Sequence, residues 1–121
     1  MSAALIDALR AHAAGLHPDE AGTELLICHG DILLREDFTG FVHTGTSISD
    51  GTTLMASIDW DAAITALDGG LLPCSSGERH MLRLAASIAA GVPVNLSDAL
   101  TGIDHRNARL LTTAVLRANG Q

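Results

Sequence analysis

The chain has 121 residues, of which 47% are hydrophobic and 2% aromatic, and its formal net charge is −7. This size and composition predict one domain of residues 1–121 with a mainly aliphatic core, and the lack of any apolar run near about 20 residues argues against a membrane span. The acidic balance disfavours non-specific binding to nucleic acid, because such binding depends on neutralising phosphates with basic side chains.

The first two predicted elements are helices. Apolar residues recur at helical spacing over residues 3–15, after Ser2 as the N-cap. Residues 18–29 form the second helix, although Gly22 inside it lowers helix propensity by about 1 kcal/mol relative to alanine. The N-terminus has an acid within its apolar stretch and no basic region, so we expect no signal peptide and a cytoplasmic protein.

The middle segment, 31–59, admits two interpretations, short helical pieces or a hairpin. Its second half is rich in threonine, serine, isoleucine and valine. The pair Asp50-Gly51 is a strong turn signal, because glycine tolerates positive φ. We therefore predict a small hairpin, with strands at about 41–48 and 52–59, which has to pack on helices or pair with another chain because an isolated hairpin is marginally stable.

Two helices are predicted after the hairpin from their capping residues. A helix over residues 60–68 is capped by Asp59 or Asp61. Ser75 and Glu78, three residues apart, form a capping box in front of a longer amphipathic helix.

The last part of the chain contains a short turn and a final helix. Ser97 caps the turn, Gly102 ends it, and Asp104 begins the helix. On this helix we expect Ala108, Leu111 and Val115 to face inward, with Asn107, Leu110, Ala114 and Ala118 beside them. The fold class is therefore mainly α, a single compact domain of five or six helices with one small hairpin.

The stretch "CSSGERHMLRLAASIAAGVPVNLSDALTGIDHRNARLL" resembles the signature loop and the following loop of an ABC-type ATPase. That resemblance would imply ATP hydrolysis, which needs a lysine on the terminal phosphates and carboxylates for magnesium. The chain contains no lysine, and Asp98 stands alone where an acidic pair is wanted. Helix capping explains the matching letters. We therefore expect no catalytic residue and favour a protein that is not an enzyme.

Two stretches, "IDWDAAITALDGGLLPCSSGERHMLRLAASIA" and "DALTGIDHRNARLLTTAVLRANG", resemble a group of short, lysine-poor proteins of GC-rich actinobacteria. The resemblance covers residues 57–120. This group has no established activity, so the resemblance implies a source and no chemistry.

The six histidines and two cysteines raise the question of a metal site or a reactive thiol. The candidate ligands are His12 with His17, and Cys28 with His29 and Asp31. Neither set has the paired spacing of a zinc site, so we predict no metal and no other cofactor. Cys74 precedes a predicted helix N-terminus, which lowers a thiol's pKa, but no base is positioned beside it. We favour a packing role for Cys74 and leave open whether the two thiols are redox-active.

The function favoured by these observations is a non-catalytic protein–protein interaction or regulatory module, including self-association. Contiguous apolar surface often marks an interface. The charge is also divided, with a net −9 over residues 1–74 and +2 over residues 75–121, which would orient a partner or a second copy. Candidate interface anchors are Trp60, Phe38 and Phe41, with core packing as the alternative for the two phenylalanines.

The alternative function is a small nucleic-acid-binding regulator. Its candidate contacts are two pairs of arginines, each pair about one helical turn apart: Arg79 with Arg83, and Arg106 with Arg109. Arginine reaches both phosphates and guanine edges. The same side chains would otherwise contact a protein partner.

Overall fold

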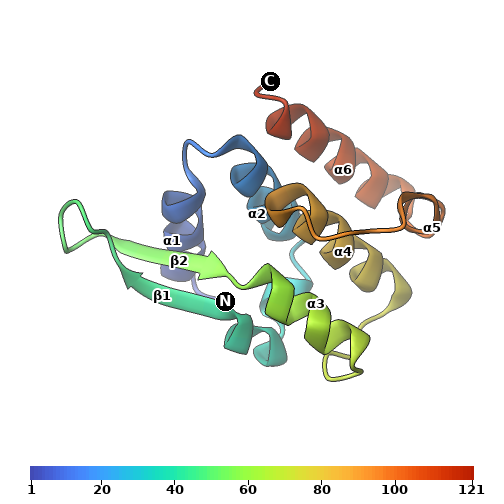
Figure 1. The fold of residues 1–121 in the computed structure, drawn as a ribbon, viewed down its shortest axis with the longest axis horizontal. Helices are drawn as coiled ribbons and strands as arrows, with labels where there is room; N and C mark the ends of the chain where they lie inside the picture. The colour runs from blue at the N-terminus through green and yellow to red at the C-terminus, as the bar shows by residue number, and fades with distance from the viewer.

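A computed structural model describes residues 1–121 as six α-helices, two short 3₁₀ helices and one antiparallel hairpin (Figure 1). In chain order the elements are α1 (Ala3–Ala13), α2 (His17–His29), η1 (Ile32–Leu34), η2 (Glu36–Phe41), β1 (Val42–Thr46), β2 (Leu54–Ile58), α3 (Trp60–Asp68), α4 (Ser76–Ala90), α5 (Leu96–Thr101) and α6 (His105–Ala118). The predicted mainly α fold with one small hairpin is confirmed. None of the helices combines the length and the apolar character that crossing a membrane requires.

Side chains at the helix N-termini satisfy backbone N–H groups that the helices leave free. The Ser2 hydroxyl accepts from the Leu5 N–H at 3.2 Å. In the capping box of α4, the Ser75 hydroxyl accepts from the Glu78 N–H at 3.2 Å, and the Glu78 carboxylate accepts from the Ser75 N–H at 2.9 Å. This bond to the Ser75 backbone lowers the pKa of Glu78. Asp104 caps α6 as predicted.

The caps of α3 and α5 refine the sequence prediction. Of the two candidates for α3, Asp59 is the cap, and its carboxylate accepts from the Ala62 N–H at 3.1 Å. The prediction for α5 was wrong, because Asn95 caps this helix by accepting from the Asp98 N–H at 3.1 Å. Ser97 lies within the first turn. Asparagine and serine cap about equally well, so the spacing alone did not separate them.

The buried face of α6 also differs from the prediction. Ala108 and Val115 are exposed, and the buried side chains are Asn107, Leu111 and Ala114. Because α6 packs mainly on one neighbour, α2, only a narrow stripe at i, i+4 and i+7 is covered.

Helix α2 is central, because α1, α4 and α6 all pack against it (Figure 1). Its crossing with α4 takes place at Gly22. A Cβ at this position would lie 2.5 Å from the Ala89 Cβ and 2.6 Å from the Ala85 carbonyl oxygen. The glycine that weakened the helix prediction is therefore the residue that lets the two backbones approach closely.

The core is one cluster of 23 buried side chains, almost all of them aliphatic. The largest with less than 2% exposure are Phe38, Leu9, Leu25, Leu26, Ile32, Leu72, Met81 and Leu82. They come from α1, α2, η1, η2, α4 and the loop before α4. The helices and the 3₁₀ segment thus enclose a common interior, to which β1 contributes no buried residue.

The middle segment combines both predicted interpretations. Residues 32–41 form the two short 3₁₀ helices, and the hairpin follows. Its register runs from Val42 opposite Ile58 to Thr46 opposite Leu54. The predicted hairpin is confirmed, with strands shorter than expected because the connecting loop takes up seven residues, 47–53.

The hairpin loop is stabilised by Asp50. Its carboxylate accepts from the N–H groups of Thr52 and Thr53, both at 2.9 Å, and from the Thr53 hydroxyl. These bonds, that of the Thr53 hydroxyl first, lower the pKa of Asp50 to about 2. The aspartate of the predicted turn therefore orders a longer loop by an Asx-type turn.

Candidate functional site

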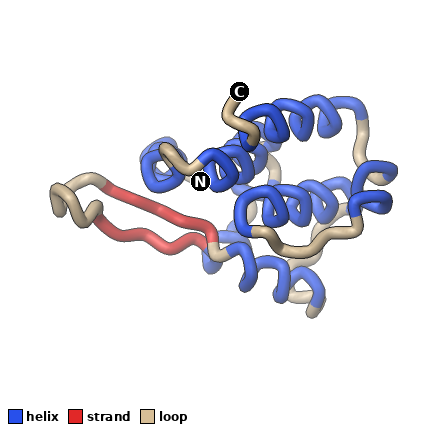
Figure 2. Tube along the Cα trace, turned by 45° about the horizontal axis from the view of Figure 1, so that its top comes forward, coloured by secondary structure: helices blue, strands red, loops and turns tan.

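The hairpin, residues 42–58, projects from the helical body and is called the arm below (Figure 2). Its base is anchored by Ala56 and Ile58, which are buried where β2 packs beside α1. Farther out it is exposed: Leu54 keeps 44% of its surface in solvent, and Ile48 is fully exposed. The outer part of the arm thus contributes little to the core.

The outer edge of β1 has no neighbouring strand, and neither view of the ribbon shows an element along it (Figures 1 and 2). The Ser47 N–H donates to the Thr53 carbonyl and the Asp59 N–H to the Phe41 carbonyl, both at 2.8 Å. Since hydrogen-bonded and open positions alternate in an antiparallel pair, the odd-numbered residues of β1 face β2. The backbone groups that face outward are those of Val42, Thr44 and Thr46.

Part of this edge is available for pairing. The Val42 N–H donates to the Thr39 carbonyl. The N–H groups of Thr44 and Thr46 face outward without such a partner. Edge strands in native proteins are usually protected by proline, charged side chains or bulges. β1 has the sequence Val-His-Thr-Gly-Thr and an unbroken register, so it contains no proline, no bulge and no Asp, Glu, Lys or Arg.

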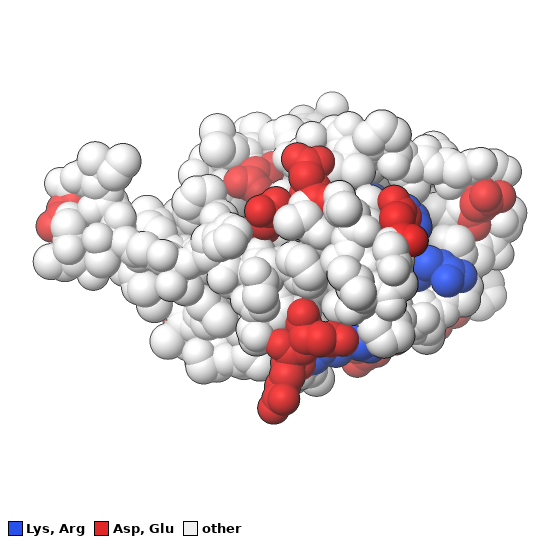
Figure 3. Space-filling view, turned by 60° about the horizontal axis from the view of Figure 1, so that its bottom comes forward, with Lys and Arg blue, Asp and Glu red and all other residues white.

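The arm is also nearly free of charge. Between residues 38 and 58 the only Asp, Glu, Lys or Arg is Asp50, which is engaged in the loop. Figure 3 shows acidic side chains over the body, while the arm at the left is almost free of them. In a chain of net charge −7, the arm therefore adds little charge repulsion to a contact between two copies.

Of the predicted interface anchors, two are core residues in this fold. Phe38 has no exposed surface, and Trp60 is 7% exposed. Phe38 is therefore not a surface anchor, which agrees with the core-packing alternative for this residue. Phe41 is half-buried at the base of β1, with its ring centroid 5.7 Å from that of Phe38.

The predicted arginine contacts line two different hollows. Arg79 and Arg83 line a groove of about 390 Å³ between α4 and α5, together with His80. Arg106 and Arg109 line a separate hollow on α6. The two pairs are thus not brought into one cleft.

Two of these four arginines are used in internal contacts. Arg83 forms an ion pair with Asp68 at 2.5 Å. The Arg106 guanidinium donates to the Cys28 carbonyl at 3.1 Å and stabilises the C-terminus of α2, where the helix dipole favours a cation. Arg79 makes no ion pair within the chain, and neither does Arg109. Nucleic-acid binding through these side chains stays a prediction.

The residues that resemble the loops of an ABC-type ATPase have structural roles in this fold. Ser75 and Glu78 form the capping box of α4. Gly102 lies against the imidazole of His80, and a Cβ at this position would collide with that ring. Asp104 caps α6. Each residue therefore has a local structural role, as the capping interpretation predicted.

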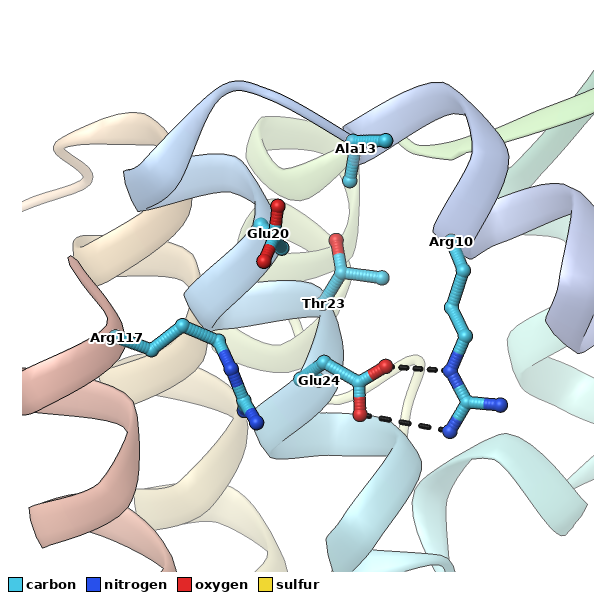
Figure 4. Close-up of a pocket in the computed structure, with 7 residues that line it drawn as sticks. Arg10, Ala13, Glu20, Thr23, Glu24 and Arg117 are labelled. Carbon is cyan, nitrogen blue, oxygen red and sulfur yellow. Dashed lines mark hydrogen bonds and ion pairs between the residues drawn. The ribbon is translucent and has the colours of Figure 1, made fainter. Parts of the chain in front are cut away.

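A second candidate site is a polar hollow between α1, α2 and α6, called the three-helix pocket below (Figure 4). Its volume is about 470 Å³. The side chains that matter for its chemistry are Arg10, Ala13, Glu20, Thr23, Glu24 and Arg117. One wall is an ion pair in which the Arg10 guanidinium donates to the Glu24 carboxylate at 2.5 and 3.5 Å. This bond raises the pKa of Arg10.

The two cysteines are free and lie in different surroundings. Cys28 is exposed on α2, and its thiol lies 3.7 Å from a Glu24 carboxylate oxygen. Partial desolvation by neighbouring atoms, followed by the charge of Glu24, raises the pKa of the Cys28 thiol. Burial also raises the pKa of Cys74, so the expected lowering by the α4 N-terminus was wrong. Both pKa shifts disfavour the thiolate, which is the nucleophilic form of cysteine.

The candidate metal ligands are not gathered into a site. No three of the His, Cys, Asp or Glu side chains are placed to hold one ion. His12 lies 3.9 Å from Asp19, and the His29 side chain is buried while Cys28 is exposed. The adjacent residues Cys28 and His29 thus differ in environment, as expected for neighbours on a helix.

Two buried polar side chains have an atom without a hydrogen-bond partner: His29 Nδ1 and Asn107 Oδ1. They are 5% and 6% exposed. Burial lowers the pKa of His29, and the charge of Asp31 opposes this shift. Such groups are costly to bury, and helical spacing alone does not reveal that these two atoms lack a partner.

Sequence reasoning missed the open edge of β1 and the three-helix pocket. The scarcity of charge between residues 38 and 58 was visible and would have pointed to the arm. The spacing of Glu20, Thr23 and Glu24 on one helix was also visible. The approach of Arg10 and Arg117 from α1 and α6 depends on helix packing, which no local pattern encodes.

Comparison with models of protein families, with curated proteins and with solved structures finds no significant match to this chain.

Proposed function

We propose that this protein is a non-catalytic interaction module that self-associates through the arm, by antiparallel pairing of β1 with β1 of a second copy. The observation that carries the proposal is the open, uncharged outer edge of β1. A two-fold axis at Thr44 gives a symmetric contact in which both copies use the same surface. The product is a four-stranded sheet in the order β2-β1-β1-β2.

The hydrogen bonds of this contact follow from the register. The Thr44 N–H of each copy donates to the Thr44 carbonyl of the other. The Thr46 N–H donates to the Val42 carbonyl of the second copy. Four bonds therefore form, and the bond from Val42 to Thr39 is retained.

Charge does not oppose a second copy at the arm. Two chains of net charge −7 repel one another, and this repulsion is smallest where both surfaces are uncharged. Strand pairing covers less area than the roughly 1,200–2,000 Å² of a stable complex, so we expect a reversible dimer with a dissociation constant in about the micromolar range.

The test is Thr44→Pro. Proline removes the outward N–H at the centre of the contact but no N–H of the β1–β2 ladder, so the arm should still fold. Sedimentation at increasing concentration should show wild type shifting from monomer to dimer and the variant remaining monomeric. Thr44→Ser keeps the N–H and should dimerise as wild type does. Amide spectra of the arm report whether the ladder is intact.

Two results would overturn the proposal. One is a wild type that stays monomeric up to about millimolar concentration. The other is a Thr44→Pro variant with a folded arm that dimerises as wild type does. Salt separates this contact from the alternative pairing of the acidic and basic parts of two copies. Added salt should leave the edge contact intact or strengthen it, and would weaken a contact between opposite charges.

A further inference from the structure

The three-helix pocket contains a buried threonine, Thr23, whose hydroxyl is used differently from those of three other helical threonines. Thr101, Thr112 and Thr113 each donate their hydroxyl to a backbone carbonyl one turn earlier, at 2.9, 2.9 and 3.2 Å. Thr23 is 4% exposed, and its hydroxyl makes no such bond. Figure 4 shows this hydroxyl directed into the pocket. A buried hydroxyl open to a cavity is available to a ligand.

Some of the charged side chains around this hydroxyl are paired with an opposite charge, and others are not. Glu24 is neutralised by Arg10. Glu20 accepts one bond, from the Gly15 N–H at 3.3 Å, on one of its two carboxylate oxygens. Arg117 reaches the pocket from α6 (Figure 4) and forms no ion pair within the chain. One cation, Arg117, and one anion, Glu20, therefore remain available in the pocket that Thr23 also lines.

We infer that the three-helix pocket binds a small zwitterion of the free amino-acid class. The ligand carboxylate accepts from the Arg117 guanidinium and the Thr23 hydroxyl, and the ligand ammonium donates to the free oxygen of Glu20. A simple anion would bind Arg117 but would meet the acidic side of the pocket unpaired, which disfavours it. The volume of about 470 Å³ lies within the usual range for small-molecule sites.

This inference does not depend on self-association, because the pocket lies on the helical body and the dimer contact on the arm. The probes are L-alanine and propionate, which differ by the ammonium group, with L-leucine and L-arginine to test side-chain size and charge. Titration of ¹⁵N-labelled protein detects weak binding. We expect saturable shifts of amides around Gly15, Thr23 and Arg117, with L-alanine binding at least about fivefold more tightly than propionate.

Three variants assign the contacts. Arg117→Gln should weaken both probes by about tenfold or more, and Thr23→Val, which keeps the shape of the side chain, should weaken both by several-fold. Glu20→Gln should weaken L-alanine but not propionate, because only L-alanine carries the ammonium group. The matched control is Arg109→Gln, an exposed arginine on α6 outside the pocket, which should change neither affinity.

The inference is overturned if none of the four probes gives saturable shifts up to about 20 mM. It is also overturned if propionate binds as tightly as L-alanine, or if Arg117→Gln leaves the affinity for L-alanine unchanged. Each variant's amide spectrum is compared with that of wild type, so that a loss of fold is distinguished from a loss of binding.

Discussion

The helical body and the arm differ in how much of their surface is buried within the chain. In the body, buried and mostly aliphatic side chains from all six α-helices and both 3₁₀ helices share one core. Side chains cap the N-terminus of every α-helix except α2. In the arm, only the base is buried, and the outer strand has four exposed residues out of five. The body is stabilised by its own contacts, whereas the outer arm has backbone groups and apolar side chains that only another molecule would cover. Substitutions in the two regions should therefore affect different measurements.

The largest effect on folding is expected from Gly22→Ala, in the body. The added Cβ would meet the backbone of α4 at Ala85 and Ala89, which forces the helices apart, and the gain in helix propensity offsets only part of that cost. We expect the free energy of unfolding to fall by about 2 kcal/mol. Denaturant unfolding with a fitted m-value measures this change.

The matched control lies in the arm. A Cβ at Gly45 meets nothing within 4 Å, and its φ is not positive. Gly45→Ala should leave stability unchanged or raise it by about 0.5 kcal/mol. Equal losses for the two variants would mean that the close approach of α2 and α4 is not what requires glycine at position 22.

A smaller effect is expected from acid, through His29. Burial lowers its pKa, whereas in the unfolded chain it titrates at about 6.5. The unfolded chain therefore binds more protons below that pH, and the free energy of unfolding should fall as the pH decreases from about 7 to 5. The charges that face this imidazole are Asp31, Glu78, Asp104 and Arg106.

The variant His29→Gln tests whether His29 causes this acid sensitivity. The measured quantity is the slope of the free energy of unfolding against pH, and not the free energy at one pH. The slope between about pH 5 and 7 should become shallower in His29→Gln, because the carboxylates with lowered pKa act at lower pH. His17→Gln removes an exposed histidine and should leave the slope as in wild type. An unchanged slope in His29→Gln would assign the acid sensitivity to other groups.

The sequence predicted the body better than it predicted the sites, for a physical reason. Caps such as Ser2, the Ser75–Glu78 box and Asp104 act within three residues, so their letters are enough to place helix starts. The stripe of α6 depends on how many neighbours it meets, and the expected inward positions Ala108 and Val115 were wrong. The pocket and the free edge arise where segments distant in sequence meet, or fail to meet, and local spacing does not determine that.

The smallest effect on folding, and a clear effect on association, is expected from Ile48→Ser. Ile48 is fully exposed, so the free energy of unfolding should change by less than about 0.5 kcal/mol. In the proposed dimer, pairing of Thr46 with Val42 of the second copy brings the loop residue Ile48 toward the start of that copy's β1, next to the half-buried Phe41. Loss of this apolar contact should weaken dimerisation by about three- to tenfold in sedimentation experiments.

The control is Leu34→Ser, which removes a 72% exposed leucine outside the arm and should leave dimerisation unchanged. Equal weakening by both variants would point to general surface hydrophobicity in place of a register-specific contact.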